Sequence, residues 1–325
     1  MLAIPPGCSA EDLPRLADWL EASVLVSDGV VSKSEVMEEI QVSGLVAAPG
    51  ESFGEDVDEI GSASDEALDD SLERLADDIL AECRRRETQL TDGYPFQVTT
   101  DLLSARPEAE PDSYAFLLVS DLGHHFSELK DALKPDTHSG MLMEKVVEAA
   151  TRGIFGRSQR FGWPREQEWP TQIKKRVKRL AKELEVPVDS LKRKVEPVDN
   201  DRTLDVVAIM TFDDTHEASL IVLIQCAAGQ NWKSKLGDPS ISAWDNLLHW
   251  QSPIIRAVAL PWRLGGRRSD WTYGRIYSMS NRAMVLDRPR LLAGQPDVHL
   301  DARIRPQLKQ WWESAINKIP DARRT

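Results

Sequence analysis

The sequence predicts an α/β (α+β) protein: a mixed sheet flanked by helices, preceded by a mostly helical and acidic N-terminal region. Residues 204–212 and 220–226 form two near-continuous apolar runs with a short polar turn between them. Runs of this length that are bounded by turn residues are typical of strands covered on both faces of a sheet. Residues 64–88 and 167–186 instead place apolar side chains at helical spacing, which predicts amphipathic helices.

The N-terminal part is predicted to be mainly helical, with helices at residues 9–25 and 34–41. Residues 47–63 are rich in Gly, Ser and acidic residues and have little to bury, which predicts a mobile linker. The next helix, 64–88, begins with acidic residues and ends near three arginines at 84–86, an order that complements the helix dipole. The arginine triplet is therefore interpreted as a helix terminus.

The middle of the chain continues with a predicted strand at 94–103 and a loop or domain joint at 104–113. Residues 114–133 and 141–155 each carry apolar residues in a helical pattern. Residues 157–162 are polar and basic and are expected to form a loop.

After the helix at 167–186 and the central strand pair, the same patterns predict two further strands and two further helices. The helices are 242–250 and 302–319, the strands are 254–260 and 283–286, and a Gly- and Arg-rich loop lies at 261–275.

The charge of the chain is distributed unevenly. Residues 1–112 hold 27 acidic and 7 basic side chains, and residues 113–325 hold 26 acidic and 33 basic ones. We therefore expect an acidic region at 1–112 with a partner-binding or sensing role, and a domain at 113–325 with its core at about 139–262 and a C-terminal helical extension. The acidic surplus fits either a solvated helical surface or one that binds a protein partner or a second copy. The net charge of −13 does not exclude nucleic acid as a partner of the C-terminal domain.

Several classes of protein are disfavoured by what the sequence lacks. Three scattered cysteines, Cys8, Cys83 and Cys226, indicate neither a disulfide framework nor a zinc site. No apolar run of membrane-spanning length and no secretory signal pattern is present, so we expect a cytoplasmic protein without a membrane partner. The sequence also lacks the G-x-S-x-G, Walker, G-x-G-x-x-G and H-E-x-x-H motifs.

Two stretches combine positive charge with features that suit nucleic acid. The basic helix and the Arg-rich loop supply side chains for phosphate neutralisation, and the aromatic residues of the loop could stack on unpaired bases. A solvated helix face and packing over the sheet edge are the alternatives. The candidate nucleic-acid-binding residues are Lys174, Lys175, Lys178, Arg179, Arg263, Arg267 and Arg268.

Two polar side chains interrupt the central strands. Asp205 begins the first run and Gln225 lies near the end of the second. With the turn centred near residue 215, the two are expected to lie side by side on paired strands. Glu144 lies beside the apolar stripe of the helix at 141–155. Carboxylate and amide oxygens are ligands that suit Mg²⁺.

This arrangement resembles the PD-(D/E)XK, or restriction-endonuclease-like, nuclease superfamily over about residues 139–262. In that family a glutamate on the first core helix, an aspartate on one strand, and an E-x-K or Q-x-K on the next gather one or two Mg²⁺ ions. The resemblance implies that Glu144, Asp205 and Gln225 are catalytic residues that bind Mg²⁺ or Mn²⁺. Such nucleases combined with an unrelated front domain resemble prokaryotic anti-phage defence proteins.

The sequence departs from the family pattern at one position. The lysine that should follow Gln225 by two residues is replaced by Ala227. A positive charge is needed there to orient the water and to stabilise the charge that develops on the phosphate. Lys233 and Lys235 are the candidate catalytic replacements, with Lys145 or a basic residue of 157–160 as alternatives.

The leading expectation is a Mg²⁺-dependent endonuclease that cleaves DNA as the effector of a defence system. The first alternative is an inactive nuclease-fold module that binds nucleic acid or scaffolds a complex, and the second is a protein-binding subunit that acts through the charge of residues 1–112. A nucleophilic Cys226 paired with His216 or His249 is a weaker alternative, since a cysteine in an apolar strand is more often a core residue.

Overall fold

The computed structural model describes residues 1–27, 29–46, 61–108, 112–126, 129–134, 136–165, 168–186, 202–210, 212, 219–229, 231–250, 252–264 and 281–319. The chain forms two compact units: Met1–Lys134 with Trp312–Thr325, and Pro135–Trp311. The division falls C-terminal to the boundary at 112 that the charge distribution predicted. The reason is that α4 (Asp112–His125) packs against α1 (Leu13–Val26), where the Tyr114 hydroxyl donates to Glu21 Oε2 at 2.8 Å.

The first unit combines helices with a three-stranded antiparallel sheet in the order β1-β3-β2. Its remaining elements are β1 (Val30–Ser32), α2 (Lys33–Ser43), α3 (Gly61–Leu90), the 3₁₀ helix η1 (Thr91–Gly93), β2 (Phe96–Val98) and β3 (Leu102–Ala105). The single strand expected at 94–103 is thus wrong in part. Two strands form because the chain turns at Thr99, whose Oγ1 accepts from the backbone N–H of Leu102 at 3.1 Å. The expected linker at 47–63 lies outside the described residues up to 60, and its last residues begin α3.

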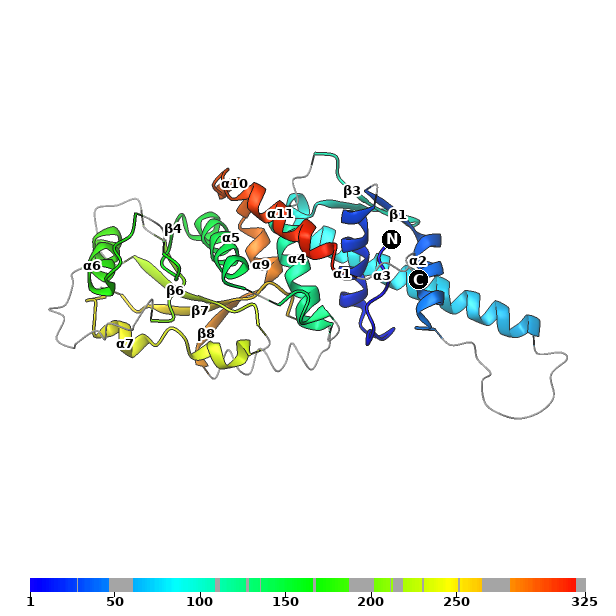
Figure 1. Cartoon of the computed structure of the whole chain (residues 1–325), viewed down its shortest axis with the longest axis horizontal. Coiled ribbons are helices and arrows are strands. Elements are labelled where there is room, and N and C mark those ends of the chain that lie inside the picture. The colour runs from blue at the N-terminus through cyan, green and yellow to red at the C-terminus, as the bar shows by residue number, and fades with distance from the viewer. Residues whose placement is uncertain are drawn as a thin grey trace. The chain divides into compact units, whose positions relative to one another are not determined.

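The second unit is a mixed α/β structure around a five-stranded sheet (Figure 1). The sheet has the order β4-β5-β6-β7-β8; the first three strands are antiparallel, and β6, β7 and β8 are parallel. Its elements are α5 (Thr137–Phe155), β4 (Arg157–Arg160), α6 (Ile173–Leu184), β5 (Val206–Met210), β6 (Leu220–Cys226), the 3₁₀ helix η3 (Trp232–Gly237), α7 (Ile241–Asp245), β7 (Ile255–Ala259), β8 (Ala283–Leu286), α9 (Arg288–Ala293), α10 (Pro296–His299) and α11 (Arg305–Ile316), whose last residues belong to the first unit. The mixed sheet flanked by helices confirms the coarse prediction of an α/β (α+β) class.

The expectation of a loop at 157–162 is wrong. Residues Arg157 to Arg160 form the edge strand β4, which pairs with β5 so that Arg160 lies opposite Val206. None of the four residues of this strand is apolar. Its pairing with β5 stabilises it instead of the burial of apolar side chains. A polar strand of this kind gives no hydrophobic periodicity to read.

Helices cover the sheet on its two faces. α5 contacts β4, β5 and β6, and Figure 1 shows it across the sheet from α7. An apolar core on the other face joins α6 to β5, β6 and α7, through Val177, Leu180, Val207, Leu223 and Trp244 among others. Within the described residues, none of the helices has the length and apolar character that crossing a membrane requires.

Candidate metal centre

Asp205 and Gln225 lie side by side, as the turn length predicted. β5 and β6 pair with Val206 opposite Ile224, which places Asp205 opposite Gln225. The Gln225 amide Nε2 donates to Asp205 Oδ2, and the backbone N–H of Cys226 donates to the same oxygen at 2.6 Å. Asp205 is 7% exposed and Gln225 is 6% exposed. Two donors therefore fix the Asp205 carboxylate in a largely desolvated place.

The backbone of Asp205 is held equally firmly. Its N–H donates to the carbonyl of Ile224 at 3.0 Å, and its carbonyl accepts from Phe161 at 2.7 Å and from Gly162 at 3.0 Å. The segment after β4 is thereby fastened to the start of β5. This fastening brings Gly162 to the edge of the site.

Glu144 enters from α5 and meets both β4 and Gly162. The guanidinium Nε of Arg160 lies 2.6 Å from Glu144 Oε2, and the side chains are 1% and 9% exposed. A Cβ at position 162 would overlap the Glu144 carboxyl group, so glycine allows the close approach and a larger residue would force Glu144 to shift. A buried carboxylate needs such a partner, because an unpaired charge in a desolvated place is strongly destabilising.

The pKa of the Cys226 thiol depends on its burial and on several charges of this site. Desolvation raises the pKa of Cys226 well above its usual value, and the negative charges of Asp205 and Glu144 raise it further. Lys235 and Arg160 act in the opposite direction on the same pKa. Two carboxylates and two cations thus act electrostatically on one thiol. Because its pKa is raised, that thiol is a poor nucleophile.

The candidate replacements for the missing lysine are placed differently. Ala227 is 1% exposed and packs in an apolar cluster with Trp232 and Leu236, so the family's lysine position is occupied by core. Lys235 is partly exposed, and its charge acts to lower the pKa of the Cys226 thiol. Lys233 is exposed, with its ammonium 5.9 Å from the centre of the Trp232 ring.

Lys145 and Arg157, two alternatives for the catalytic cation, contact residues other than the predicted metal ligands. Lys145 lies 3.9 Å from Glu148 Oε2. Arg157 donates to the carbonyl of Glu183 at 2.8 Å. Of the basic residues at 157–160, Arg160 is the one that contacts a predicted ligand.

The donor set fits a hard divalent cation. Mg²⁺ prefers oxygen ligands and keeps several waters, so two carboxylates and an amide oxygen suffice. Both hydrogens of Gln225 Nε2 are used, by Asp205 Oδ2 and by the carbonyl of Cys226 at 3.0 Å, which leaves Oε1 as the atom that could ligate a metal. Among the described residues, no three His, Cys, Asp or Glu side chains converge as a ready-made metal cluster. Glu144 would therefore have to turn from Arg160 to share an ion with Asp205.

The basic helix α6 presents a divided surface. Lys174, Lys175 and Lys178 are exposed. Arg179 is partly buried: its guanidinium lies 4.6 Å from the centre of the Trp169 ring and its Nε donates to Glu183 at 2.9 Å. Three of the four predicted contacts on this helix are thus exposed on its surface.

The predicted nucleic-acid loop can be described only at its start. Arg263 is partly exposed, whereas Arg267 and Arg268 lie outside the described residues, as does His216.

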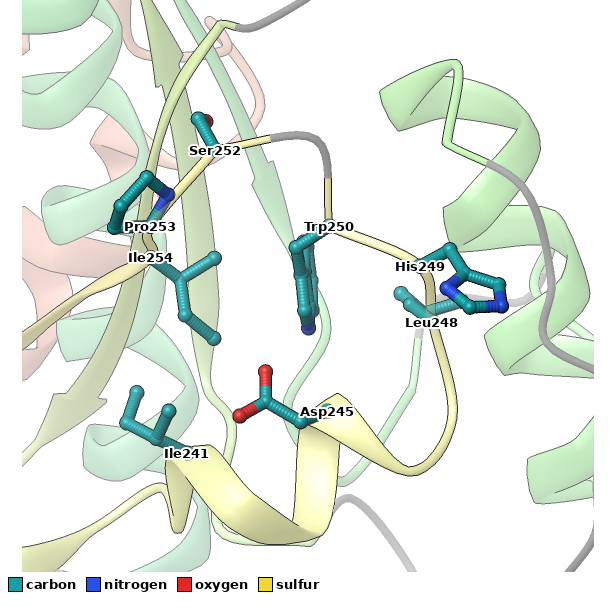
Figure 2. Close-up of a pocket in the computed structure, with 8 residues that line it drawn as sticks. All are labelled: Ile241, Asp245, Leu248, His249, Trp250, Ser252, Pro253 and Ile254. Carbon is teal, nitrogen blue, oxygen red and sulfur yellow. The ribbon is translucent and has the colours of Figure 1, made fainter.

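A separate pocket of about 600 Å³ lies at the other end of the central strands. Figure 2 shows the Trp250 indole between Ile254 and His249, with the Asp245 carboxylate directed towards it. Ile254 precedes β7, whereas Gln225 pairs with Val258 near the end of that strand. Cys226 and His249 therefore lie at opposite ends of the strands, which is incompatible with a Cys–His catalytic pair.

Glu144, Asp205 and Gln225 were predicted from the sequence. The role of Gly162 and the pairing of Arg160 with Glu144 were not. The signal for Gly162 was a glycine just after a basic segment, which has no meaning until the close approach of α5 is known. No family model matches the chain, and no curated protein or solved structure matches it.

Proposed function

We propose that the Pro135–Trp311 unit is a metal-dependent nuclease of the restriction-endonuclease-like fold that hydrolyses phosphodiester bonds in DNA. The observation that carries this proposal is the neighbourhood of Glu144, Asp205 and Gln225, which come from three elements far apart in the sequence. The element order supports it: a helix with the glutamate, a strand that follows the aspartate, the next strand with the glutamine, then a helix and a strand.

Glu144, Asp205 and the Gln225 Oε1 atom would hold Mg²⁺ or Mn²⁺. When bound, such an ion polarises the phosphate and lowers the pKa of an attacking water. Asp205 is pre-organised for this role by the Gln225 and Cys226 donors, whereas Glu144 would have to turn from Arg160.

Lys235 is assigned the role of the missing family lysine. Its position at the partly exposed side of the site suits a cation that stabilises the negative charge developing on the phosphate. The exposed lysines of α6 would neutralise phosphates of the DNA backbone away from the scissile bond.

The acidic first unit is proposed to bind a protein partner that directs the nuclease, in the manner of an effector of prokaryotic defence. Its surplus of carboxylates supports this role, because complementary charge steers association. Partner binding that does not change with salt would contradict a role that acts through charge.

The deciding assay is cleavage of DNA by the purified chain with Mg²⁺ or Mn²⁺. Asp205→Ala is expected to abolish cleavage, and EDTA is expected to stop the wild-type reaction. Asp245→Asn is the matched control, because this exposed carboxylate lies at the other end of the strands and should leave the rate unchanged. Equal rates for wild type and Asp205→Ala would contradict the proposal.

A second candidate function is a module that binds nucleic acid without cutting it. The burial of Ala227 in an apolar cluster favours it, because the motif position offers no cation. Binding that EDTA does not change, with a salt dependence that reports several phosphate contacts, and no cleavage by the wild type would support this candidate.

A further inference from the structure

We propose that Arg160 is a built-in counter-ion of the carboxylate site, which competes with a divalent metal for Glu144 and so sets the metal affinity of the protein. The inference rests on the proposed metal centre and adds a residue that weakens the binding of the metal there. It concerns how tightly this chain binds the ion, whatever the substrate.

Arg160 is held against α5 at two points. Its backbone N–H donates to Glu148 Oε1 at 3.0 Å, and its guanidinium Nε lies 2.6 Å from Glu144 Oε2, one helical turn earlier. Its place as the last residue of β4, opposite Val206, fixes its distance from the start of β5. The arginine is therefore positioned by the sheet and by the helix, and its side chain is 1% exposed.

The same carboxylate is confined on its other side. The Gly162 backbone lies so close to Glu144 that a Cβ there would overlap both carboxylate oxygens. A carboxylate enclosed between a glycine and a guanidinium has few directions in which to accept a further ligand. A metal on Glu144 must therefore displace the guanidinium or share the carboxylate with it.

The charges around the site explain why such a counter-ion is present. Glu144 and Asp205 are two largely buried negative charges, and the Cys226 thiol lies within the influence of both. Without a metal, a desolvated carboxylate needs a cation nearby, and Arg160 supplies it for Glu144. The ion pair thus stabilises the metal-free protein, and metal binding must overcome the free energy of that pair.

The test is a calorimetric titration of the full chain with Mn²⁺, for the wild type, Arg160→Gln and Arg176→Gln. Arg176 is the matched control: it is also a buried arginine of this unit, but its guanidinium lies 4.3 Å from the Phe161 ring centre and donates to the Phe161 carbonyl. Arg160→Gln is expected to bind Mn²⁺ at least about tenfold more tightly, because the ion would no longer compete with a buried positive charge for Glu144. Arg176→Gln is expected to match the wild type.

An unchanged or lower affinity in Arg160→Gln would overturn the inference while leaving the metal centre intact. If neither the wild type nor Arg160→Gln bound Mn²⁺, the metal centre and the proposed nuclease would fail together with the inference. These outcomes are distinct because the readout is affinity and not activity.

Removal of a buried charge partner could unfold Arg160→Gln, so Arg160→Lys serves as a second variant. Lysine keeps the positive charge but loses the planar fork and some reach, so the pair with Glu144 weakens. Tighter Mn²⁺ binding than in the wild type is expected, and an equal or weaker affinity would again overturn the competition.

Discussion

Each unit of this protein buries a group of charged side chains. The two groups differ in the partners of their carboxylates and in the exposure of the neighbouring side chains. In the first unit, Arg86 on α3 donates to Asp18, to Glu21 Oε1 at 2.9 Å and to Glu82 Oε1 at 3.3 Å. All four side chains are at most 5% exposed. In the second unit, Glu144 and Asp205 are also buried, but Cys226 and Lys235 beside them are partly exposed.

The partners of the carboxylates differ as well. The Glu21 oxygens accept from two tyrosine hydroxyls, those of Tyr94 and Tyr114, each at 2.8 Å, in addition to Arg86. Asp205 Oδ2 instead accepts from an amide and a backbone N–H, and Glu144 lies against the Arg160 guanidinium and Gly162. The first group is centred on one arginine and adds hydrogen bonds from two tyrosines, whereas the second adjoins the partly exposed Cys226. Burial of charge is thus common to both groups, and the partly exposed neighbours distinguish the second.

The largest expected effect follows from removing the cation of the first group. Arg86→Met leaves three carboxylates buried without their common partner, so unit 1 is expected to lose about 3–5 kcal/mol of stability. Arg74→Ala, an exposed arginine of the same helix, is the control, and its loss should change stability by less than about 1 kcal/mol. Urea denaturation, with hydrogen exchange of α1 and α3 amides, measures both. Equal stabilities would show that the first group is not structural.

The next effect separates the two lysines of η3. Lys235→Ala is expected to lower the cleavage rate about 10²–10³-fold, because it removes a charge aimed at the developing negative charge of the phosphate. Lys233→Ala should leave the rate close to that of the wild type, since Lys233 lies over the Trp232 ring. Single-turnover cleavage rates compare the two. A larger loss for Lys233→Ala would reassign the catalytic cation.

Gly162 tests the close approach that shapes the second group. Gly162→Ala places a methyl group against the Glu144 carboxylate, which is expected to cost about 1–3 kcal/mol and to displace that side chain. Gly140→Ala, on the helix α5 that carries Glu144 and with open space around its Cβ, should stabilise the protein by up to about 1 kcal/mol. Thermal unfolding of both variants provides the measurement. Two changes of the same sign and size would contradict the placement of Gly162.

The smallest effect concerns the α6 surface. Replacing Lys174, Lys175 and Lys178 by Gln should weaken DNA binding and reduce the slope of log K against log salt by about 3. Lys309→Gln, an exposed lysine of α11, is the control and should leave the slope unchanged. Fluorescence anisotropy at several salt concentrations tests this. An unchanged slope in the triple variant would remove α6 from the proposed DNA surface.

The parts of the fold that bury continuous apolar runs could be predicted from the sequence. β6 and β8 begin and end where their runs predicted, at Leu220–Cys226 and Ala283–Leu286, and the Asp205–Gln225 pair followed from the length of one turn. β4 could not be predicted, because it is stabilised by pairing to β5 and carries a polar sequence. The short helices α9 and α10 were also missed, because each is too short to show a period.

The contacts that shape the candidate site could not be predicted from the sequence, for a different reason. Arg160 meets Glu144 only because β4 pairs with β5 and α5 packs on both strands. Such a contact has no local sequence signature. Residue types therefore revealed the candidate ligands, whereas the counter-ion emerged only from the tertiary arrangement.

The proposed function depends on Glu144, Asp205 and Gln225 sharing a divalent ion. Anomalous diffraction from crystals of the full chain grown with Mn²⁺ tests it most directly. We expect a peak bound by the Asp205 and Glu144 carboxylates and the Gln225 amide oxygen, with the Arg160 guanidinium shifted from its 2.6 Å contact with Glu144. No peak at these residues at saturating Mn²⁺, with Glu144 still on Arg160, would contradict it.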